Sequence, residues 1–264
     1  MANLILCGIS GRMGQRMADL VQHFPKLQLL AGIERAGSAA IGKAAGKLGV
    51  VDNLASIIDQ SDVLIDFTHP ESTLKHLELC VKHQKALVIG TTGFSESERK
   101  KILEAAQKIS VVFSSNMSVG VNVMWKIIAE ATKALGPSYD IEVLEMHHRL
   151  KKDAPSGTAM TTAEVLAEAS GRNLSKDAIY ARQGMIGERK ANEIGIQTLR
   201  GGDVVGDHTV YFAGIGERLE ITHRATSRDT FAQGALRAAE WLIGKKPGLY
   251  SMQDVLGLNN EKSS

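Results

Sequence analysis

The residues best suited to chemistry lie in one run, residues 145–159. It reads Glu-Met-His-His-Arg-Leu-Lys-Lys-Asp-Ala-Pro-Ser-Gly-Thr-Ala, so that several cations stand directly before a proline-bounded helix start. Lysine ammonium groups hold carboxylates as point charges, and the N–H groups of Gly157 and Thr158 at a helix start can bind a carboxylate as well. A histidine can supply a proton near neutral pH. The run therefore predicts a binding and proton-transfer site for a small acidic substrate.

The same run has two other interpretations. A solvated basic loop would explain the cations, but it does not explain the adjacent histidines His147 and His148 leading into Pro-Ser-Gly-Thr. A zinc site is not favoured, because the two histidines are sequence neighbours without an accompanying set of acidic ligands. We therefore expect no metal.

A second candidate site is the turn Gly8-Ile9-Ser10-Gly11-Arg12-Met13-Gly14, between an apolar run and a helical pattern. Its glycines allow a tight turn and bring backbone N–H groups to a pyrophosphate. The spacing GxxGxxG differs from the commoner GxGxxG, and glycines that merely turn the chain are the alternative. Glu34, about twenty residues further on, stands where an acidic residue binds the adenine ribose. Its neighbour Arg35 can meet the 2′-phosphate of NADPH, so the pair predicts both NADH and NADPH unless it is only a solvated strand end.

Two later strand ends belong to the same predicted crevice. Gly90-Thr91-Thr92-Gly93 follows the fourth apolar run, and Ser114-Ser115-Asn116-Met117 follows the fifth. Each in isolation reads as an ordinary strand-to-helix turn. Because the carboxyl ends of parallel strands meet at one sheet edge, the two loops together indicate contacts with the nicotinamide half of a dinucleotide.

The elements that must position these residues begin with an α/β segment. Up to Asn116 the chain alternates short apolar runs with amphipathic ones, which is typical of a parallel sheet. The expected strands are residues 3–7, 27–33, 63–67, 86–89 and 111–114. The expected helices are residues 12–23, 70–83 and 95–108, the last with Ile102 and Leu103 against the sheet. We therefore expect a Rossmann-like, doubly wound parallel sheet.

After Asn116 the pattern changes to α+β. Residues 119–135, 158–170 and those from 230 on read as helices, and residues 141–146 as a strand leading into the cationic run. Residues 194–199, 208–213 and 218–225 read as antiparallel strands. We therefore expect a discontinuous dinucleotide-binding domain, residues 1–117 and 229–264, with an inserted substrate-binding and oligomerisation domain on a mixed sheet, residues 118–228. The polar tail, residues 259–264, is expected to fray.

The composition argues against several other classes. The 264 residues are 44% hydrophobic and 23% charged, as in ordinary globular proteins. A net charge of +2 without a basic block argues against nucleic acid and anionic membranes as partners. The chain shows no signal-peptide pattern and no apolar stretch near the ~18 residues of a membrane span. Cys7 and Cys80 lack metal-ligand spacing and suit a reducing compartment, so we expect a cytoplasmic protein.

The run 145–159 resembles the signature of the 4-hydroxy-tetrahydrodipicolinate reductases, also called dihydrodipicolinate reductases, of lysine and diaminopimelate biosynthesis. The similarity extends along the chain in family order, through the opening glycine turn, Asp66-Phe67-Thr68, Gly90-Thr91-Thr92-Gly93 and Gly248-Leu249-Tyr250-Ser251-Met252. One departure is that Gly8 is not followed by the Ala-Gly pair that many relatives carry. Backbone contacts with phosphates are expected to survive it.

The resemblance implies NADH- or NADPH-dependent reduction of a cyclic imine dicarboxylate, by hydride transfer and protonation. It implies that His147 is the proton donor and acceptor, that Lys151 is a proton donor, and that His148, Lys151, Gly157 and Thr158 bind the substrate. It implies cofactor contacts for Gly8, Ile9, Ser10, Gly11, Arg12, Met13, Glu34, Arg35, Gly90, Thr91, Thr92, Ser114, Ser115, Asn116 and Met117. A homotetramer joined through the second domain is implied as well.

Two other function classes remain open from the residues alone. Another two-domain NAD(P)-dependent dehydrogenase of an amino-acid-like substrate would share this layout. Its thioester-forming version is disfavoured, because Cys7 lies in an expected strand and Cys80 in an expected helix. A non-catalytic regulator that senses NAD(H) would need a DNA-binding helix pair or a basic patch, and the sequence suggests neither.

Overall fold

The computed structural model describes residues 1–259, so the expectation for the tail falls, from residue 260 on, outside the described residues. The chain forms two compact units. Unit 1 comprises Met1–Val119 and the segment that begins at Arg228, and unit 2 comprises Gly120–Ser227. Unit 2 is therefore inserted into unit 1. Within the described residues, no helix has the length and apolar character needed to cross a membrane.

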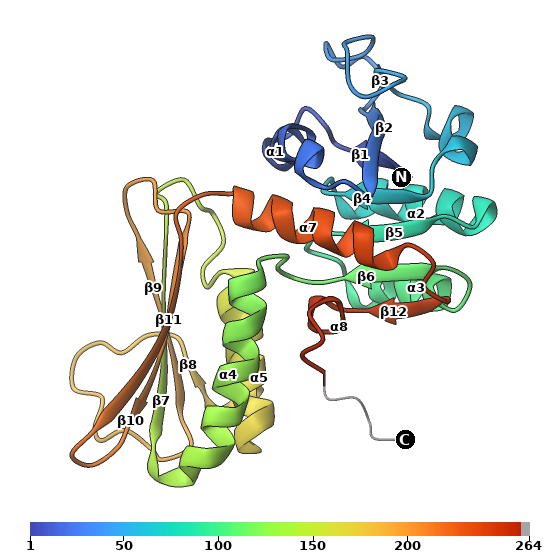
Figure 1. Cartoon of the computed structure of the whole chain (residues 1–264). Coiled ribbons are helices and arrows are strands. Elements are labelled where there is room, and N and C mark those ends of the chain that lie inside the picture. The colour runs from blue at the N-terminus through green and yellow to red at the C-terminus, as the bar shows by residue number, and fades with distance from the viewer. Residues whose placement is uncertain (260–264) are drawn as a thin grey trace. The chain divides into compact units, whose positions relative to one another are not determined.

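Unit 1 is built on a 7-stranded parallel sheet in the order β12-β6-β5-β4-β1-β2-β3 (Figure 1). The strands are β1 (Ala2–Cys7), β2 (Leu27–Ile33), β3 (Val50–Val51), β4 (Val63–Asp66), β5 (Ala86–Ile89), β6 (Ser110–Phe113) and β12 (Gly248–Tyr250). The chain order runs outward in both directions from the β1–β4 pair. In such sheets the ligand crevice lies at this switch point, outside the carboxyl ends of the strands. The expected Rossmann-like fold is confirmed.

Helices cover both faces of this sheet, which explains why its strands are nearly continuous in aliphatic residues. The helices α1 (Arg12–Leu20) and α7 (Asp229–Leu242) bury Met17, Leu236 and their neighbours against one face. The helices α2 (Pro70–His83) and α3 (Glu96–Ala106) bury Leu77 and Ile102 against the other. The expectation that Leu103 packs on the sheet is wrong. Leu103 lies one residue further round α3 than Ile102 and is more than half exposed.

Unit 2 is built on a 5-stranded mixed sheet in the order β11-β10-β7-β9-β8. The strands are β7 (Asp140–His147), β8 (Ala178–Ile179), β9 (Ile194–Arg200), β10 (Gly206–Ala213) and β11 (Arg218–Ala225). As expected, β10 and β11 are antiparallel. The expectation that residues 194–199 form an antiparallel strand is wrong, since β9 runs parallel to β7. A helical crossover through α5 (Gly157–Ser170) separates the two strands, and such a crossover permits parallel pairing.

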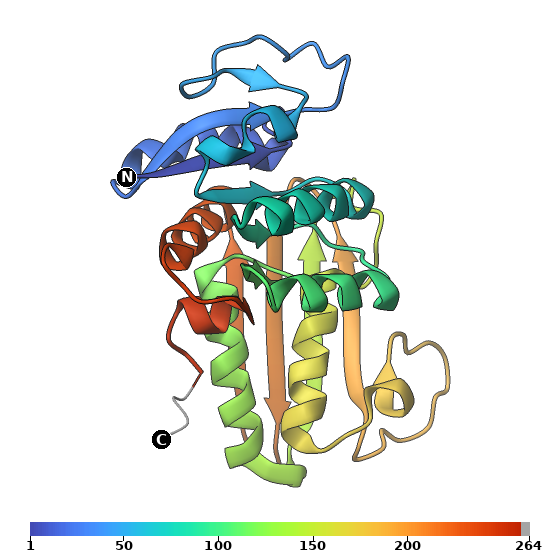
Figure 2. The same ribbon diagram turned by 90° about the vertical axis from the view of Figure 1, so that its right-hand side faces the viewer.

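The helices α4 (Val119–Leu135) and α5 lie side by side over one face of the unit 2 sheet (Figure 2). Trp125 of α4 donates a hydrogen bond to Thr162 of α5 at 2.9 Å. The shared core contains Ile128, Leu166, Val143 and Phe212 among others. The inward residues of β7 alternate with half-buried outward ones, so Glu145 and His147 point to the same side as this core.

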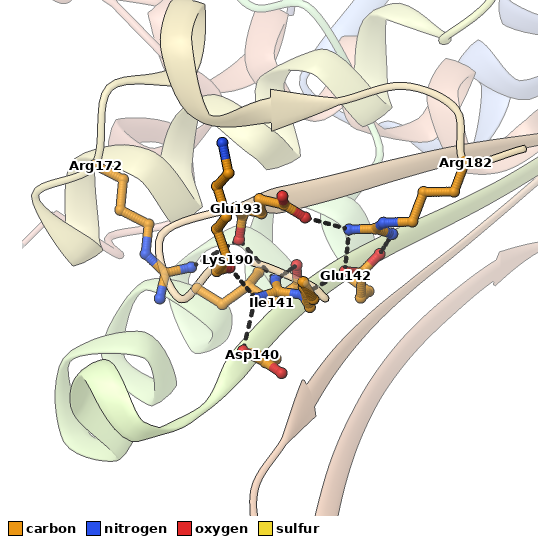
Figure 3. Close-up of polar contacts among 8 residues, drawn as sticks. Asp140, Ile141, Glu142, Arg172, Arg182, Lys190 and Glu193 are labelled. Atoms are coloured by element: carbon orange, nitrogen blue, oxygen red, sulfur yellow. Dashed lines mark hydrogen bonds and ion pairs between the residues drawn. The ribbon is translucent and has the colours of Figure 1, made fainter. Parts of the chain in front are cut away.

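At the β8–β9 edge, arginines fix the loop that spans residues 180–193 (Figure 3). Arg182 makes paired hydrogen bonds with Glu142 at 2.7 and 2.9 Å. Arg189 donates to Glu142 at 3.0 Å and to Asp140 at 2.6 Å. Gly195 leaves room for the Glu142 carboxylate, because a Cβ at this position would overlap it. Within the described residues, the remaining short elements are α6 (Leu174–Asp177), α8 (Met252–Val255) and the 3-10 turns Val21–His23, Leu54–Ser56, Ile58–Gln60 and Gly136–Ser138.

Candidate functional site

The glycine turn of unit 1 packs closely on α1. Gly8 has φ +76°, a left-handed conformation that glycine adopts without strain. Its N–H donates to the carbonyl of Ile33 in β2 at 2.9 Å. A Cβ on Gly14 would collide with the Gly8 carbonyl and the Ile9 backbone. This packing places the N-terminus of α1, with its outward-pointing N–H groups, at the carboxyl end of β1.

A cavity of about 720 Å³ lies beside this turn. The predicted cofactor residues that line it are Gly8, Ser10, Gly11, Arg12, Met13, Glu34 and Arg35. The side chain of Ile9 is buried against Gly32 instead. The lining also includes residues that sequence reasoning did not place there, namely Ile33, Ser38, Asp52, Phe67, Thr68, His69, Ser72 and His76. Their common signal is position, since most follow β2 or β4, the strands on either side of β1.

Glu34 stands at the end of β2 on the cavity wall. Its Oε1 accepts hydrogen bonds from the N–H of Ser10 at 2.8 Å and from the Ser10 hydroxyl at 2.5 Å. The carboxylate thus faces the glycine turn with its acceptor oxygens, as a ribose-binding residue must. The next residue, Arg35, is exposed at the same wall.

A buried polar cluster around Asp66 fixes another part of the wall. Its carboxylate accepts from the hydroxyls of Thr68 at 2.6 Å and Thr73 at 2.9 Å, and lies 2.6 Å from Nδ1 of His76. Cys7 brings its sulfur within 4.8 Å of the Asp66 and His76 ligand atoms. Burial first, and the nearby Asp66 charge second, raise the pKa of Cys7 well above its ordinary value. The thiol is therefore protonated, and a metal would need it ionised.

Among the described residues that line the cavity, none comes from the two later predicted loops. Gly90 lies against the Phe67 ring, which a Cβ at this position would overlap. Thr91 is buried, and its hydroxyl oxygen lies 2.9 Å from that of Thr73. Ser114 donates to the carbonyl of Asn116 at 2.9 Å. Gly90 and Thr91 therefore support the wall from behind, and cofactor contacts for the loops at 90–92 and 114–117 stay a prediction.

In unit 2, the buried carboxylate of Glu145 organises the predicted catalytic run. Arg200 donates to it with two nitrogens, each at 2.9 Å. The N–H of Ser156 donates at 2.9 Å, and Nδ1 of His147 lies 2.5 Å away. Glu145 and His147 meet because residues i and i+2 of a strand point to the same face.

Electrostatics keep this carboxylate ionised. Burial by itself would raise the pKa of Glu145, but hydrogen bonds from His147, Arg200 and the Ser156 backbone outweigh it and lower the pKa to about 2. An ionised acceptor holds the proton of His147 on Nδ1, so Nε2 is the nitrogen left for exchange with a ligand. Gly206 gives Nε2 its room, since a Cβ there would lie only 3.0 Å from it.

The rest of the run folds over this pair. His148 donates its N–H to the carbonyl of Val204 at 2.7 Å, and the N–H of Lys151 donates to the carbonyl of His148 at 3.1 Å. The Lys151 ammonium lies 3.0 Å from Asp153. Ser156 caps α5 by accepting from the N–H of Ala159 at 3.1 Å. The predicted residues His147, Lys151, Gly157 and Thr158 thus lie on the end of β7, on the loop after it and at the start of α5, all within unit 2.

Sequence reasoning missed three supporting residues: Glu145 as the partner of His147, Arg200 and His208. Glu145 carried a usable signal, its place two residues before His147 on a strand. Arg200 and His208 come from β9 and β10, and only the sheet register brings them beside β7.

The glycine turn, the cavity and Glu34 fit a dinucleotide, because they offer backbone N–H groups and a ribose acceptor where side chains would obstruct phosphates. Unit 2 adds a carboxylate-oriented histidine beside a lysine and a helix N-terminus. Fold and site together define a two-domain, dinucleotide-dependent oxidoreductase. Residues 2–117 match the family described as dihydrodipicolinate reductase, N-terminus, and residues 120–256 match dihydrodipicolinate reductase, C-terminus. The chain belongs to the dihydrodipicolinate reductase family, whose members are NAD(P)H-dependent enzymes of lysine and diaminopimelate biosynthesis.

Individual relatives agree with this assignment. The 4-hydroxy-tetrahydrodipicolinate reductase of Anaeromyxobacter dehalogenans (strain 2CP-C) is 53% identical over 270 residues, which cover 99% of this chain and 100% of the relative. The enzyme of the same name from Hahella chejuensis is 54% identical over 266 residues, with 98% and 100% covered. The solved structure of a dipicolinate-bound dihydrodipicolinate reductase from Paenisporosarcina sp. TG-14 is similar with a TM-score of 0.78 and 26% identity, over 96% of this chain and 98% of that one. The resemblance expected from the sequence is confirmed.

Proposed function

We propose that this protein reduces 4-hydroxy-tetrahydrodipicolinate, a cyclic imine with two carboxylates, to tetrahydrodipicolinate. The observation that carries the proposal is the Glu145–His147 pair, set beside Lys151 and the N-terminus of α5. Loss of the 4-hydroxyl as water leaves an electron-poor ring. Bound NADH or NADPH supplies a hydride to ring carbon 4, and the protein delivers a proton to the adjacent carbon.

Unit 1 holds the dinucleotide in this proposal. The N–H groups from Gly8 to Met13 bind the pyrophosphate, Glu34 accepts the ribose hydroxyls, and Arg35 binds the 2′-phosphate when NADPH is used. Support comes from the cavity these residues line. The loops at 90–92 and 114–117 are assigned to the nicotinamide half on the family resemblance.

Unit 2 holds the substrate. Lys151, His148 and the N–H groups of Gly157 and Thr158 bind its carboxylates, because a helix N-terminus and an ammonium both favour anions. In its imidazolium form, with a proton on each ring nitrogen, His147 gives the Nε2 proton to the ring carbon and keeps the Nδ1 proton in its hydrogen bond to Glu145. Lys151 serves as a further proton donor.

Kinetics of three variants test the assignment, with substrate generated enzymatically and NADH absorbance as the signal. His147→Gln should lower kcat by roughly 10²–10⁴-fold, because it removes general acid catalysis. Lys151→Ala should lower kcat and also raise KM, because the ammonium contacts a carboxylate in the ground state. Lys152→Ala, an exposed neighbour, is the matched control and should behave as wild type. If either His147→Gln or Lys151→Ala keeps wild-type kcat and KM, the run is a solvated basic loop and the site assignment is wrong.

We further propose a cytoplasmic homotetramer joined through unit 2. The sheet face opposite α4 and α5 carries Leu144, Met146 and Leu199, of which Leu199 is almost half exposed. The anchored loop also presents Met185 and Ile186 to solvent. Exposed apolar side chains on this sheet face and loop favour burial against further copies of the chain. Sedimentation equilibrium should give four times the chain mass of 28.4 kDa, and a monomer would contradict this proposal.

A further inference from the structure

His208 is a buried histidine that no step of the proposed mechanism uses. It lies in β10, opposite Glu145 of β7 and His223 of β11 in the sheet register. Its ring meets the His147 ring edge to face, with centroids 5.2 Å apart. Its Nε2 lies 3.3 Å from the hydroxyl oxygen of Ser156, the cap of α5. His208 therefore touches both the predicted proton donor and the predicted carboxylate-binding helix start.

The hydrogen-bond pattern assigns the tautomer of His208. Within the described part of the chain, its Nδ1 is buried and has no hydrogen-bond partner. A buried N–H without an acceptor is costlier and rarer than an unfilled acceptor. The proton therefore belongs on Nε2, from which it donates to Ser156 Oγ. That oxygen then has two donors, His208 Nε2 and the N–H of Ala159.

His208 is also held neutral. Burial, and next the neighbouring His147, lower the pKa of His208 to about 3, while Glu145 acts in the opposite direction. His223 of β11 and Lys151 of the covering loop add to the lowering. These groups face the ring from β7, from β11 and from the loop after β7, and with burial they keep His208 neutral near neutral pH.

We propose that His208 is a positioning residue, which fixes the Ser156 cap of α5 and the His147 ring in one arrangement without exchanging protons itself. The inference rests on the proposed function, because the two groups it joins are the proton donor and a carboxylate site. Both contacts are buried, because the side chains of His147, Ser156 and His208 are all nearly inaccessible to solvent. Misplacing either group by about 1 Å can cost about 10²-fold in rate.

Two substitutions separate the two contacts. His208→Phe keeps an aromatic ring against His147 but removes the donor to Ser156, and it leaves no unpaired polar atom, so the fold should survive. His208→Gln keeps an N–H donor at a similar reach but removes the ring. We expect His208→Phe to lower kcat/KM about tenfold to a hundredfold, with the Kd for NADH unchanged. We expect His208→Gln to recover only part of that loss, because it restores a donor to Ser156 but not the ring against His147. His23→Phe, the same substitution at an exposed histidine of unit 1, is the matched control.

Two further readouts exclude a merely structural effect. The double variant His208→Phe/Ser156→Ala should be no worse than the poorer single variant, because both changes break the same contact. The pH profile of kcat should keep its wild-type apparent pKa values in His208→Phe. Additive losses, or the disappearance of one limb of the profile, would show that His208 acts through another route and would overturn the proposal.

Neutron diffraction and ligand binding decide the question without turnover. At neutral pH, deuterium should lie on Nε2 of His208 and be absent from Nδ1; the reverse overturns the proposal. By calorimetry, pyridine-2,6-dicarboxylate should bind His208→Phe about tenfold more weakly than wild type, since α5 loses its fixed start. If wild type fails to reduce the proposed substrate, the proposed function is wrong and these two measurements still judge His208. If wild type turns over and His208→Phe matches it, the positioning role alone is wrong.

Discussion

The buried, ionised carboxylate of Glu145 fixes the orientation and the tautomer of the His147 ring. Taking a charge out of water is costly, and Glu145 is compensated by the paired nitrogens of Arg200 and by the Ser156 N–H. An uncharged Glu145 would no longer hold a proton on Nδ1 of His147, and Nε2 would lose its fixed role. Arg200 thus serves the chemistry without needing to touch a ligand.

The same burial makes the protein sensitive to acid through His208. The pKa of His208 is lowered to about 3 by burial and His147, whereas an unfolded histidine titrates near 6.5. Between about pH 3 and about pH 6.5, His208 carries a proton in the unfolded state but stays neutral in the folded state. The stabilisation is therefore complete above about pH 6.5 and is lost as the pH falls towards about 3.

Urea unfolding across this range should reveal the effect. Below about pH 6.5 the free energy of unfolding of wild type should fall relative to that of His208→Phe, by up to about 1.4 kcal/mol per pH unit. The exposed His23 provides the control, because His23→Phe should track wild type. Parallel curves for wild type and His208→Phe would mean that His208 is protonated in the folded protein.

At the scale of elements, unit 1 depends on how closely α1 approaches the end of β1. Gly14 is the residue that permits this approach, because its missing Cβ leaves space for the Gly8 carbonyl. Arg35 lies at the end of β2 and has no part in this packing. Substitutions at Gly14 and at Arg35 should therefore distinguish binding of the pyrophosphate, which both cofactors carry, from recognition of the 2′-phosphate of NADPH.

We expect Gly14→Ala and Arg35→Ala to fail differently in cofactor titrations. Gly14→Ala should weaken NADH and NADPH alike, because the turn that binds the shared pyrophosphate is displaced. Arg35→Ala should weaken NADPH more than NADH, because only NADPH carries the 2′-phosphate. Lys47→Ala, an exposed cation outside the cavity lining, controls for a general loss of positive charge. Equal losses of both cofactors in Arg35→Ala would show that Arg35 does not read the 2′ position.

The longer elements of unit 1 were predictable because each leaves a local signal. Apolar runs, Pro70 at a helix start and the Ser95 cap with its Glu98 partner mark strands and helices within a few residues. The direction of β9 left no such signal, since parallel and antiparallel strands share one alternation of side chains. The two-residue strands β3 and β8 are too short for any periodicity to show.

The candidate site was predictable where its residues are close in sequence. His147, Lys151 and Thr158 fall in one run, and Gly8 to Met13 in another. His76 and His208 were missed, since their positions depend on pairings across the sheet or on packing of α2, which no local pattern encodes. The Asp66 cluster was missed for the same reason.

At the scale of the whole molecule, the two units have separate hydrophobic cores. Unit 1 has one core on each face of its sheet, and the core of unit 2 lies between its sheet and its helices. Among residues 1–259, the core of unit 2 contains only unit 2 side chains, with Val121 and Phe212 among them. Each unit can therefore be stabilised by its own ligand.

Hydrogen exchange with one ligand at a time should show which unit binds the dinucleotide and which binds the substrate. A ligand at about a hundred times its Kd stabilises the state it binds by about 2.7 kcal/mol, which slows exchange through ligand-releasing openings about a hundredfold. NADH alone should therefore protect amides of the glycine turn and of the β2 end near Glu34. Pyridine-2,6-dicarboxylate alone should protect the amides of Gly157 and Thr158, where a carboxylate sits on the α5 N-terminus. Amides of α3, which lines neither site, provide the internal reference in both experiments. Protection of the glycine turn by the dicarboxylate, with Gly157 and Thr158 unaffected, would reverse the assignment of dinucleotide to unit 1 and substrate to unit 2.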